Sequence, residues 1–459
     1  MKLGLHFRPS RCLRSSALLA LAGTSLLLLH LGCGSRHPPP GVLLISIDTI
    51  RADHMSVYGY ARPSTPNLEA FAADAVVFDN AYAASSTTGP SHATLFTGIY
   101  APRHGVNANA VVLAERHHTL AEVLRDEGYQ TAAVLGSFVL DARFGFAQGY
   151  DVYQQDFGRD EGKFDIQEWE GIAIRDGFDR RATVVSRRAV EWLTRTRKPH
   201  RPFLLTLHYF DPHEPYRPPI EYARRLAAGR NNLGAGYDGE IAYVDDEIGR
   251  VLAALDKLGL AKTTLVVITG DHGQGLTQHN DPYHAVNIYE ESVRVPLMMR
   301  WPGRLRPGRR SLPVEQVDVL PTILGALGIG APEEIDGLDL GVGWRSNEDR
   351  DLASRPIFLY RQFYSPGRKL RKVVLGGEQF AVRVEDWKLI IAEDERRREL
   401  YDLGRDPGEL ENLYDARPAV VTRLTPVLDA WRRYVTAPPG QRILGEEERA
   451  KLRALGYVE

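Results

Sequence analysis

The residues with the clearest chemical potential lie in the hydroxyl-rich stretch from Ser85 to Gly98. Hydroxyl side chains open this stretch, Gly89-Pro90 bends it, and Ser91 begins a helix-like apolar run. Serine is a preferred N-cap residue, so we expect Thr88 to lie just before a helix N-terminus, where free N–H groups favour an anion. The stretch could therefore present a nucleophilic hydroxyl to a phosphate or sulfate ester. A turn followed by a capped helix, with no chemistry, would give the same pattern.

Acidic and histidine side chains follow three apolar runs that predict buried parallel strands. They are Asp48 after 42–47, Asp211 and His213 after 203–208, and Asp271 and His272 after 264–269. The carboxyl ends of parallel strands meet at one edge of an open α/β sheet, so these side chains could share one cleft with Thr88. Taken singly, each could instead be a turn with a surface histidine.

Helix-like segments alternate with these strands along most of the chain. The helical segments are 65–75, 119–127, 180–196, 239–258 and 317–327, and further strands are 131–135 and 295–299. This alternation predicts an α/β fold, with a doubly wound, mostly parallel sheet flanked by helices, over residues 41–331. Residues 138–177 are rich in glycine and aromatic side chains and are hard to assign.

Past Pro332 the pattern changes to short strands. The candidates are 357–360, 381–384, 388–391 and 400–403, followed by a helix at 419–434 and a helical tail from 446. They predict a smaller C-terminal α+β subdomain over residues 332–459, with a small antiparallel sheet and terminal helices.

The N-terminus has the layout of a targeting segment. Basic residues precede an apolar run at 17–31, which ends in Gly32-Cys33. This layout predicts a signal segment over residues 1–33, a lipid anchor on Cys33 and a short linker over residues 34–40. We therefore expect a membrane-anchored, extracytoplasmic lipoprotein of the bacterial periplasm or cell surface. An uncleaved anchor is the alternative.

Overall composition narrows the possibilities further. The chain has 459 residues, enough for a large core, and a formal net charge of −2, which gives no support for a nucleic-acid partner. Its two cysteines, Cys12 and Cys33, both lie in the targeting segment. The domain that follows therefore has no disulfide, no thiolate metal site and no cysteine nucleophile.

Motifs spread over the region after the linker resemble those of the sulfatase family, in the alkaline-phosphatase superfamily. They are Ile45-Ser46-Ile47-Asp48-Thr49, Thr65-Pro66-Asn67-Leu68, Pro90-Ser91-His92-Ala93, His213-Glu214-Pro215-Tyr216, Asp271-His272-Gly273, Arg294-Val295-Pro296 and Asp386-Trp387-Lys388-Leu389-Ile390. Each motif is weak alone, but together they are specific. The resemblance implies a metal-dependent, sulfatase-like ester hydrolase.

The nucleophile motif departs from the family's pattern. Sulfatases carry Cys/Ser-x-Pro-x-Arg, whose first residue is oxidised to formylglycine, whereas this chain has Thr88 first and His92 at the arginine position. Threonine is not a known substrate of that oxidation, so we expect no formylglycine. Two positions where the family keeps lysine also differ, one being His284 and the other lying in Gly136-Ser137-Phe138. This loss of positive charge should weaken sulfate binding and favours a phosphate ester.

The residues Asp48, Thr88, Asp271 and His272 resemble the ligand set of single-metal relatives with a threonine nucleophile, such as lipoteichoic acid synthases and phosphoethanolamine transferases. The resemblance implies one divalent metal ion. Two carboxylates, a hydroxyl and an imidazole suit Mn²⁺ or Zn²⁺ better than Ca²⁺, which prefers oxygen ligands alone. The metal would lower the pKa of the Thr88 hydroxyl and neutralise charge on the substrate oxygens.

Four histidines are candidates for roles around Thr88. His213 could protonate the leaving group, since histidine suits acid catalysis near neutral pH, or could be an ordinary loop residue. His92, a further catalytic candidate, could hold the nucleophile loop or contact the substrate. His279 and His284 could bind substrate oxygens, and His284 could also recruit a second metal.

The expected function is hydrolysis of a phosphate or sulfate ester through Thr88, on a small molecule, glycan or lipid headgroup, with the phosphoester favoured. Three alternatives stay open: a true sulfate esterase using unmodified Thr88, an envelope phospho-headgroup transferase, and a non-catalytic binding protein. Transferases of that kind usually carry several membrane spans, and this chain has one N-terminal apolar segment. Intact metal-ligand positions argue against a binding protein.

Overall fold

The computed structural model describes residues 40–158, 162–227, 233–341, 352, 354–370 and 373–437. The predicted signal segment, nearly all of the predicted linker and the predicted helical tail from 446 lie outside these residues. Within the described ranges, no helix combines the length and the apolar character that crossing a membrane requires.

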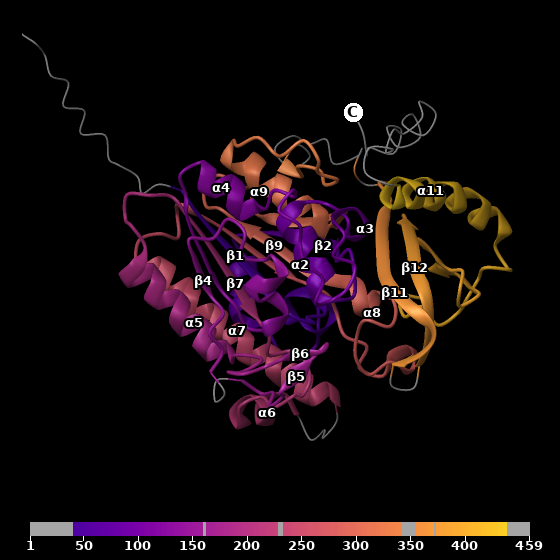
Figure 1. The fold of residues 1–459 in the computed structure, drawn as a ribbon, viewed down its shortest axis with the longest axis horizontal. Coiled ribbons are helices and arrows are strands. Elements are labelled where there is room, and N and C mark those ends of the chain that lie inside the picture. Colours follow the sequence, from indigo (N-terminus) through magenta and orange to yellow (C-terminus); the bar gives the residue numbers. More distant parts are fainter. Residues whose placement is uncertain are drawn as a thin grey trace, which may run out of the picture. The chain divides into compact units, whose positions relative to one another are not determined.

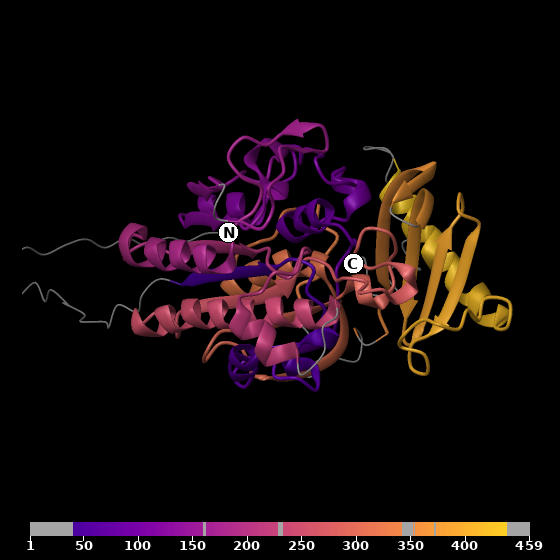
Figure 2. The same ribbon diagram turned by 90° about the horizontal axis from the view of Figure 1, so that it is seen from below.

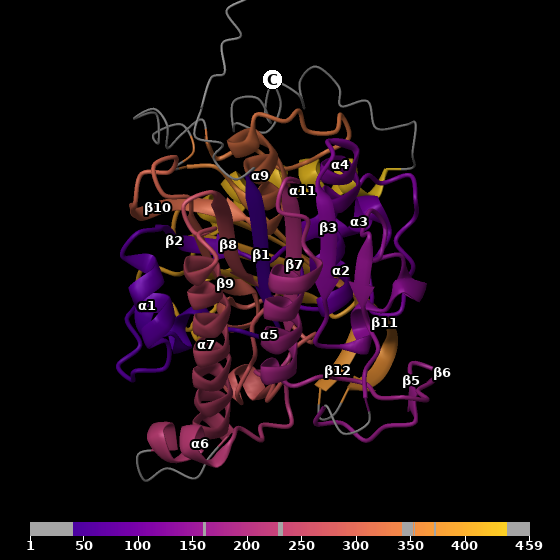
Figure 3. The ribbon, with the colours of Figure 1, turned by 90° about the vertical axis from the view of Figure 1, so that its left-hand side faces the viewer.

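A central eight-stranded sheet carries the site, with the strand order β10-β2-β9-β8-β1-β7-β3-β4 (Figure 3). Strand β1 (Gly41–Ile47) lies between two parallel neighbours, β7 (Phe203–Tyr209) and β8 (Thr264–Gly270). The other strands are β2 (Val76–Tyr82), β3 (Gln130–Val134), β4 (Val152–Gln154), β9 (Arg294–Arg300) and β10 (Gly308–Glu315). Only the pairings of β9 with β2 and β8 are antiparallel, so the mostly parallel sheet is confirmed.

Helices cover both faces of this sheet because side chains alternate along each buried strand. Val42 and Leu44 of β1 belong to the core on the face covered by three helices, α2 (Thr88–Thr97), α4 (Leu120–Asp126) and α9 (Val319–Leu327). Leu43 and Ile45 belong to the opposite core. The helices on that side are α1 (Pro66–Ala72), α5 (Ala182–Glu191) and α7 (Leu233–Lys257), and α5 and α7 lie side by side in Figure 1. The doubly wound arrangement is therefore confirmed.

The C-terminal sheet has four antiparallel strands and forms its own layer (Figure 2). The strands are β11 (Ile357–Leu370), β12 (Val373–Val384), β13 (Trp387–Ala392) and β14 (Arg397–Asp402). One face packs on α11 (Pro418–Thr436), where Trp431 stacks on Phe358 at 4.8 Å. The other face packs on Tyr82 and Ile288 of the main domain. The predicted small antiparallel sheet is confirmed.

The nucleophile stretch differs from the sequence expectation. Helix α2 begins at Thr88, and extended Thr87 precedes it, so Ser91 is not the N-cap. Pro90 fits within the first helical turn because the N–H it lacks would have no partner inside the helix. The Ser91 hydroxyl instead donates to the Ser85 carbonyl oxygen at 2.9 Å, and Thr88 stands inside the first turn rather than before it.

The described chain also contains shorter helices and a hairpin. They are α3 (Ala101–His104), α6 (Ile220–Ala227), α8 (Glu290–Val293), and the hairpin of β5 (Glu168–Trp169) and β6 (Ile172–Ala173). The hairpin lies in the segment that the sequence left unassigned. Strands β2 and β10 were not predicted either, because their burial depends on neighbours distant in the sequence.

Candidate active site

Two buried carboxylates meet at the carboxyl edge of the central sheet. Asp48 follows β1 and Asp271 follows β8, and the strand residues before them, Ile47 and Gly270, are register partners. One Asp271 oxygen accepts the backbone N–H groups of Thr49 at 3.0 Å and His272 at 2.7 Å. Burial raises the pKa of Asp48, and burial together with the Asp48 charge raises that of Asp271.

Thr88 reaches these carboxylates from the start of α2. Its Oγ1 lies 3.5 Å from Asp48 Oδ2 and 3.2 Å from His272 Nε2. The Nδ1 of His272 donates to the Gly273 carbonyl oxygen at 3.0 Å, which leaves the Nε2 lone pair facing Thr88. The hydroxyl therefore stands where a carboxylate and an imidazole converge.

These residues fit a divalent cation. Asp48, Asp271 and His272 each offer one ligand atom, and the three atoms lie within 4.8 Å of one another. Among the described residues, Asp48 Oδ1 and Asp271 Oδ2 are buried without a hydrogen-bond partner, and a cation is the natural partner for both. The imidazole in this set favours Mn²⁺ or Zn²⁺ over Ca²⁺.

His92 contacts the backbone of Thr88. It lies one helical turn after Thr88 and is completely buried. Its Nδ1 donates to the Thr88 carbonyl oxygen at 2.9 Å, and its Nε2 lies 2.9 Å from the Ser46 hydroxyl. Burial and the neighbouring His208 lower its pKa to about 4, so the ring is neutral near pH 7. These contacts fit a residue that holds the helix start.

A pocket of about 380 Å³ opens above Thr88. His213, Glu214 and His284 line it on one side. Aromatic side chains form another wall, contributed by Phe164, Trp169, Phe178 and Phe210. The Thr88 hydroxyl, His213 and His284 therefore line the same pocket as an apolar surface that suits the ring of an aryl group or a sugar.

Two of the predicted residues lie elsewhere. His279 stacks on Tyr289, and its nitrogens contact Glu291 Oε1 at 2.7 Å and the Glu409 carbonyl oxygen at 2.9 Å. Asp211 turns its carboxylate to Arg181 at 3.0 Å. Neither lines the pocket, because the loop after each strand carries successive side chains in different directions.

Four residues near the site escaped sequence reasoning. They are His208, Lys163, Gln274 and Asn109. The Nε2 of His208 lies 3.3 Å from Asp48 Oδ2, and the side-chain oxygen of Asn109 accepts the Gly89 N–H at 2.8 Å. His208 had a visible signal, since it is a polar residue inside an apolar strand. The other three lie in loops, where no local pattern marks them.

Lys163 is buried under the loop that carries His213. Its ammonium donates to the carbonyl oxygens of Asp211 and His213, both at 2.6 Å, and lies 3.6 Å from Glu240. A buried ammonium with three oxygen partners fixes the backbone of that loop, because any displacement would leave the charge unsolvated.

Replacing Lys163 by methionine should destabilise the protein, lowering its free energy of unfolding by about 2–4 kcal/mol. The carbonyl oxygens lose their donor, and Glu240 loses one of its cationic neighbours. Urea denaturation would measure the change. The exposed Lys198→Met serves as the matched control, with an expected change within about 0.5 kcal/mol. Equal effects in the two variants would contradict the assigned role of Lys163.

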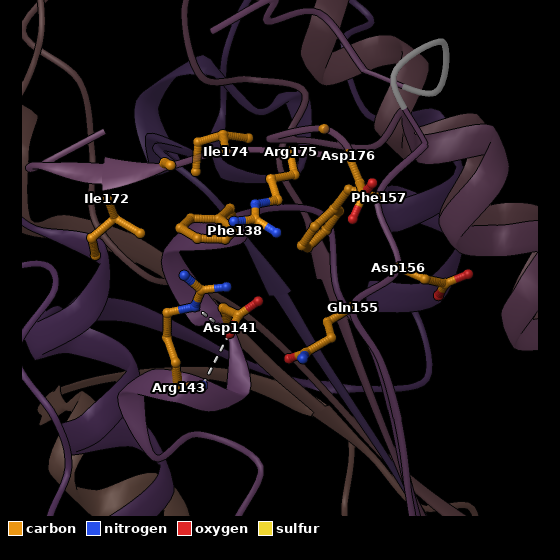
Figure 4. Close-up of a pocket in the computed structure, with 12 residues that line it drawn as sticks. Phe138, Asp141, Arg143, Gln155, Asp156, Phe157, Ile172, Ile174, Arg175 and Asp176 are labelled. Carbon is orange, nitrogen blue, oxygen red and sulfur yellow. Dashed lines mark hydrogen bonds and ion pairs between the residues drawn. The ribbon is translucent and has the colours of Figure 1, made fainter. Parts of the chain in front are cut away.

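Figure 4 shows the side chains that line a second cavity, of about 460 Å³. Phe138 lines it and stands 6.1 Å from Trp169 of the pocket wall, measured between ring centroids. Arg143 covers the Phe138 ring at 4.6 Å and bonds Asp141 at 2.9 Å (Figure 4). None of the site residues predicted from the sequence lines this cavity.

The fold and the site together define an ester hydrolase of the alkaline-phosphatase superfamily. A family model described as Sulfatase matches residues 40–329, and one described as N-sulphoglucosamine sulphohydrolase, C-terminal, matches residues 282–432. The chain belongs to the sulfatase family, which confirms the family implied by its motifs.

Individual relatives agree with this assignment. The chain is 27% identical to the N-acetylgalactosamine-6-sulfatase of Canis lupus familiaris, over 94% of this chain and 93% of the relative. A solved structure of BT4656 with its substrate D-glucosamine-2-N,6-O-disulfate has a TM-score of 0.72 at 21% identity, covering 88% of this chain and 100% of that one. The phosphonate monoester hydrolase of Agrobacterium radiobacter has a TM-score of 0.70 at 22% identity, covering 86% and 96%.

Proposed function

We propose that this protein hydrolyses a sulfate ester with Thr88 as nucleophile. The observation that carries the proposal is the position of Thr88 Oγ1, 3.2 Å from His272 Nε2 and 3.5 Å from Asp48 Oδ2, at the floor of the pocket. The curated relatives named as sulfatases support sulfate over the phosphoester that the sequence favoured. A sugar sulfate is the substrate class suggested by those names and by the aromatic wall.

The reaction proceeds in two displacements. The Thr88 oxygen attacks sulfur, the bond from sulfur to the ester oxygen breaks, and the alcohol leaves with a proton. Water then attacks the sulfothreonine, which releases sulfate and restores the hydroxyl. A divalent cation held by Asp48, Thr88, Asp271 and His272 would acidify the hydroxyl and offset the charge of the ester oxygens. His92 keeps the Thr88 backbone in place, and His213 and His284 stabilise the leaving oxygen.

A phosphate or phosphonate monoester is the second candidate substrate. None of the described residues lining the pocket is lysine or arginine, whereas sulfatases keep lysines to bind sulfate. Phosphonate monoester hydrolases also share the fold. With a phosphorus ester, Thr88 would form a phosphothreonine, which would pass its phospho group to water or to an acceptor hydroxyl of another envelope molecule. A lipid anchor on Cys33 would keep the enzyme at the membrane.

A direct comparison of esters tests the substrate class. The full chain, purified in detergent with Mn²⁺ or Zn²⁺, is assayed with p-nitrophenyl sulfate, p-nitrophenyl phosphate and p-nitrophenyl phenylphosphonate. We expect kcat/KM to be highest for the sulfate. A higher value for either phosphorus ester would replace the sulfate proposal with the second candidate. No turnover of any ester, with no bound metal, would favour a binding protein.

A further inference from the structure

A second group of metal-binding side chains lines the pocket beside the first. His213, Glu214 and His284 each offer one ligand atom, and these atoms lie within 4.8 Å of one another. The ring centroid of His284 is 4.8 Å from that of His272, so the two groups are neighbours. We propose that His213, Glu214 and His284 bind a second divalent cation, of the zinc or manganese class.

Hydrogen bonds orient both imidazoles beside Glu214, whose Oε2 lies 3.5 Å from the Nδ1 of His213 and 3.8 Å from the Nδ1 of His284. The Nδ1 of His284 donates to Gln274 Oε1 at 2.8 Å, and the Nδ1 of His213 donates to the Glu214 carbonyl oxygen at 2.6 Å. Each ring in this tautomer carries a lone pair on Nε2, whereas ligation through Nδ1 would replace the hydrogen bond that Nδ1 makes. The same Gln274 amide donates to Glu214 Oε2 at 3.0 Å, so one side chain orients two of the three ligands.

The group is also held in place by its surroundings. Phe210 stacks on the His213 ring at 4.5 Å and 22°, and Lys163 anchors the His213 carbonyl oxygen. Two histidines and a glutamate form a three-ligand set that is typical of catalytic zinc, with the remaining position open to water or substrate. That open position would face the pocket above Thr88.

The charge balance of the pocket favours the second cation. One divalent cation in the first site balances the charges of Asp48 and Asp271, but Glu170 and Glu214 still make the lining acidic. An anionic ester would enter a space with no lysine or arginine among the described lining residues. A cation at the second site would stabilise the negative charge of the leaving oxygen before that oxygen takes up its proton. That consequence rests on the proposed function, whereas the metal site does not.

Metal counting tests the site directly. The full chain in detergent is stripped with a chelator, reloaded with Zn²⁺ or Mn²⁺, dialysed and measured by inductively coupled plasma mass spectrometry. We expect two ions per chain in the wild type and one in His284→Ala. Glu214→Gln, which keeps the shape of the side chain, should lose the same ion. His200→Ala removes an exposed histidine and should retain both ions. A wild-type count of one, or an unchanged count in both pocket variants, would overturn the proposal.

Turnover separates this inference from the proposed function. His284→Ala should lower turnover by about 10²-fold, as expected when one group that stabilises developing charge is lost. If Thr88→Ala retained turnover while the wild type bound two ions, the nucleophile assignment would fail and the second site would stand. If Thr88→Ala lost turnover while the wild type bound one ion, the second site would fail alone. In a crystal of the zinc form, an anomalous peak between His213 and His284 would confirm the count.

Discussion

Thr88→Ala should lower turnover by about 10³-fold or more, the largest effect expected of any single substitution in this chain. The variant removes the only hydroxyl that lies between Asp48 and His272 among the described residues. It should leave the fold intact, because α2 is anchored by His92 and by the Ser91 hydroxyl rather than by the Thr88 side chain. Single-turnover assays with the preferred ester, together with a thermal melt, would measure both effects.

Thr88→Ser provides the matched control. Serine keeps the oxygen that attacks and removes only a methyl group, so turnover should stay within about tenfold of the wild type. Mass spectrometry of the quenched wild-type enzyme should detect a modified peptide containing Thr88, which Thr88→Ala cannot form. Full activity in Thr88→Ala would refute a nucleophilic role for this hydroxyl and would require direct attack by water.

Asp271→Asn should have opposite effects on stability and on activity. Without metal, the buried carboxylates of Asp48 and Asp271 oppose each other, and one asparagine relieves that repulsion. Asparagine also keeps the oxygen that accepts the N–H groups of Thr49 and His272. We expect the metal-free variant to gain about 1–2 kcal/mol in free energy of unfolding, while turnover falls by about 10³-fold because the cation loses a charged ligand.

The stability gain of Asp271→Asn over the wild type should increase as the pH rises. The folded-state pKa of Asp271 lies above the ordinary value of 3.8, so the folded metal-free protein retains a proton that the unfolded chain releases. The stability that the folded wild type gains from this retained proton is fully present below pH 3.8 and is lost as the pH rises through the folded-state pKa of Asp271. The difference between variant and wild type should therefore widen with rising pH.

Chemical denaturation at several pH values, with chelator present, would measure this difference. Addition of Mn²⁺ or Zn²⁺ should raise the melting temperature of the wild type by more than that of Asp271→Asn, because the variant loses a ligand of the first site and binding to the folded state alone stabilises it. Asp53→Asn is the control, since this exposed carboxylate pairs with Arg51 outside the ligand set. A metal-induced shift of equal size in Asp271→Asn would show that Asp271 is not a ligand.

The sequence by itself determined the family and the fold class, and it predicted the residues that we propose as ligands of the first cation. Apolar runs that end in Asp48 and Asp271-His272 predict neighbouring strand ends, since parallel strands place those ends at one edge. Thr88 was identifiable because its motif keeps the proline of the family pattern while changing the residue that attacks.

Only the tertiary structure decided which side chains face the pocket. Gln274 joins Glu214 across 60 positions of sequence, and Lys163 supports Asp211 across 48. The start of α2 depended on contacts as well, because Pro90 tolerates either a turn or a first helical turn. His279 and His284 are five residues apart, yet only His284 reaches the pocket. Side-chain direction in a loop follows from packing against distant elements, which no local pattern of residues encodes.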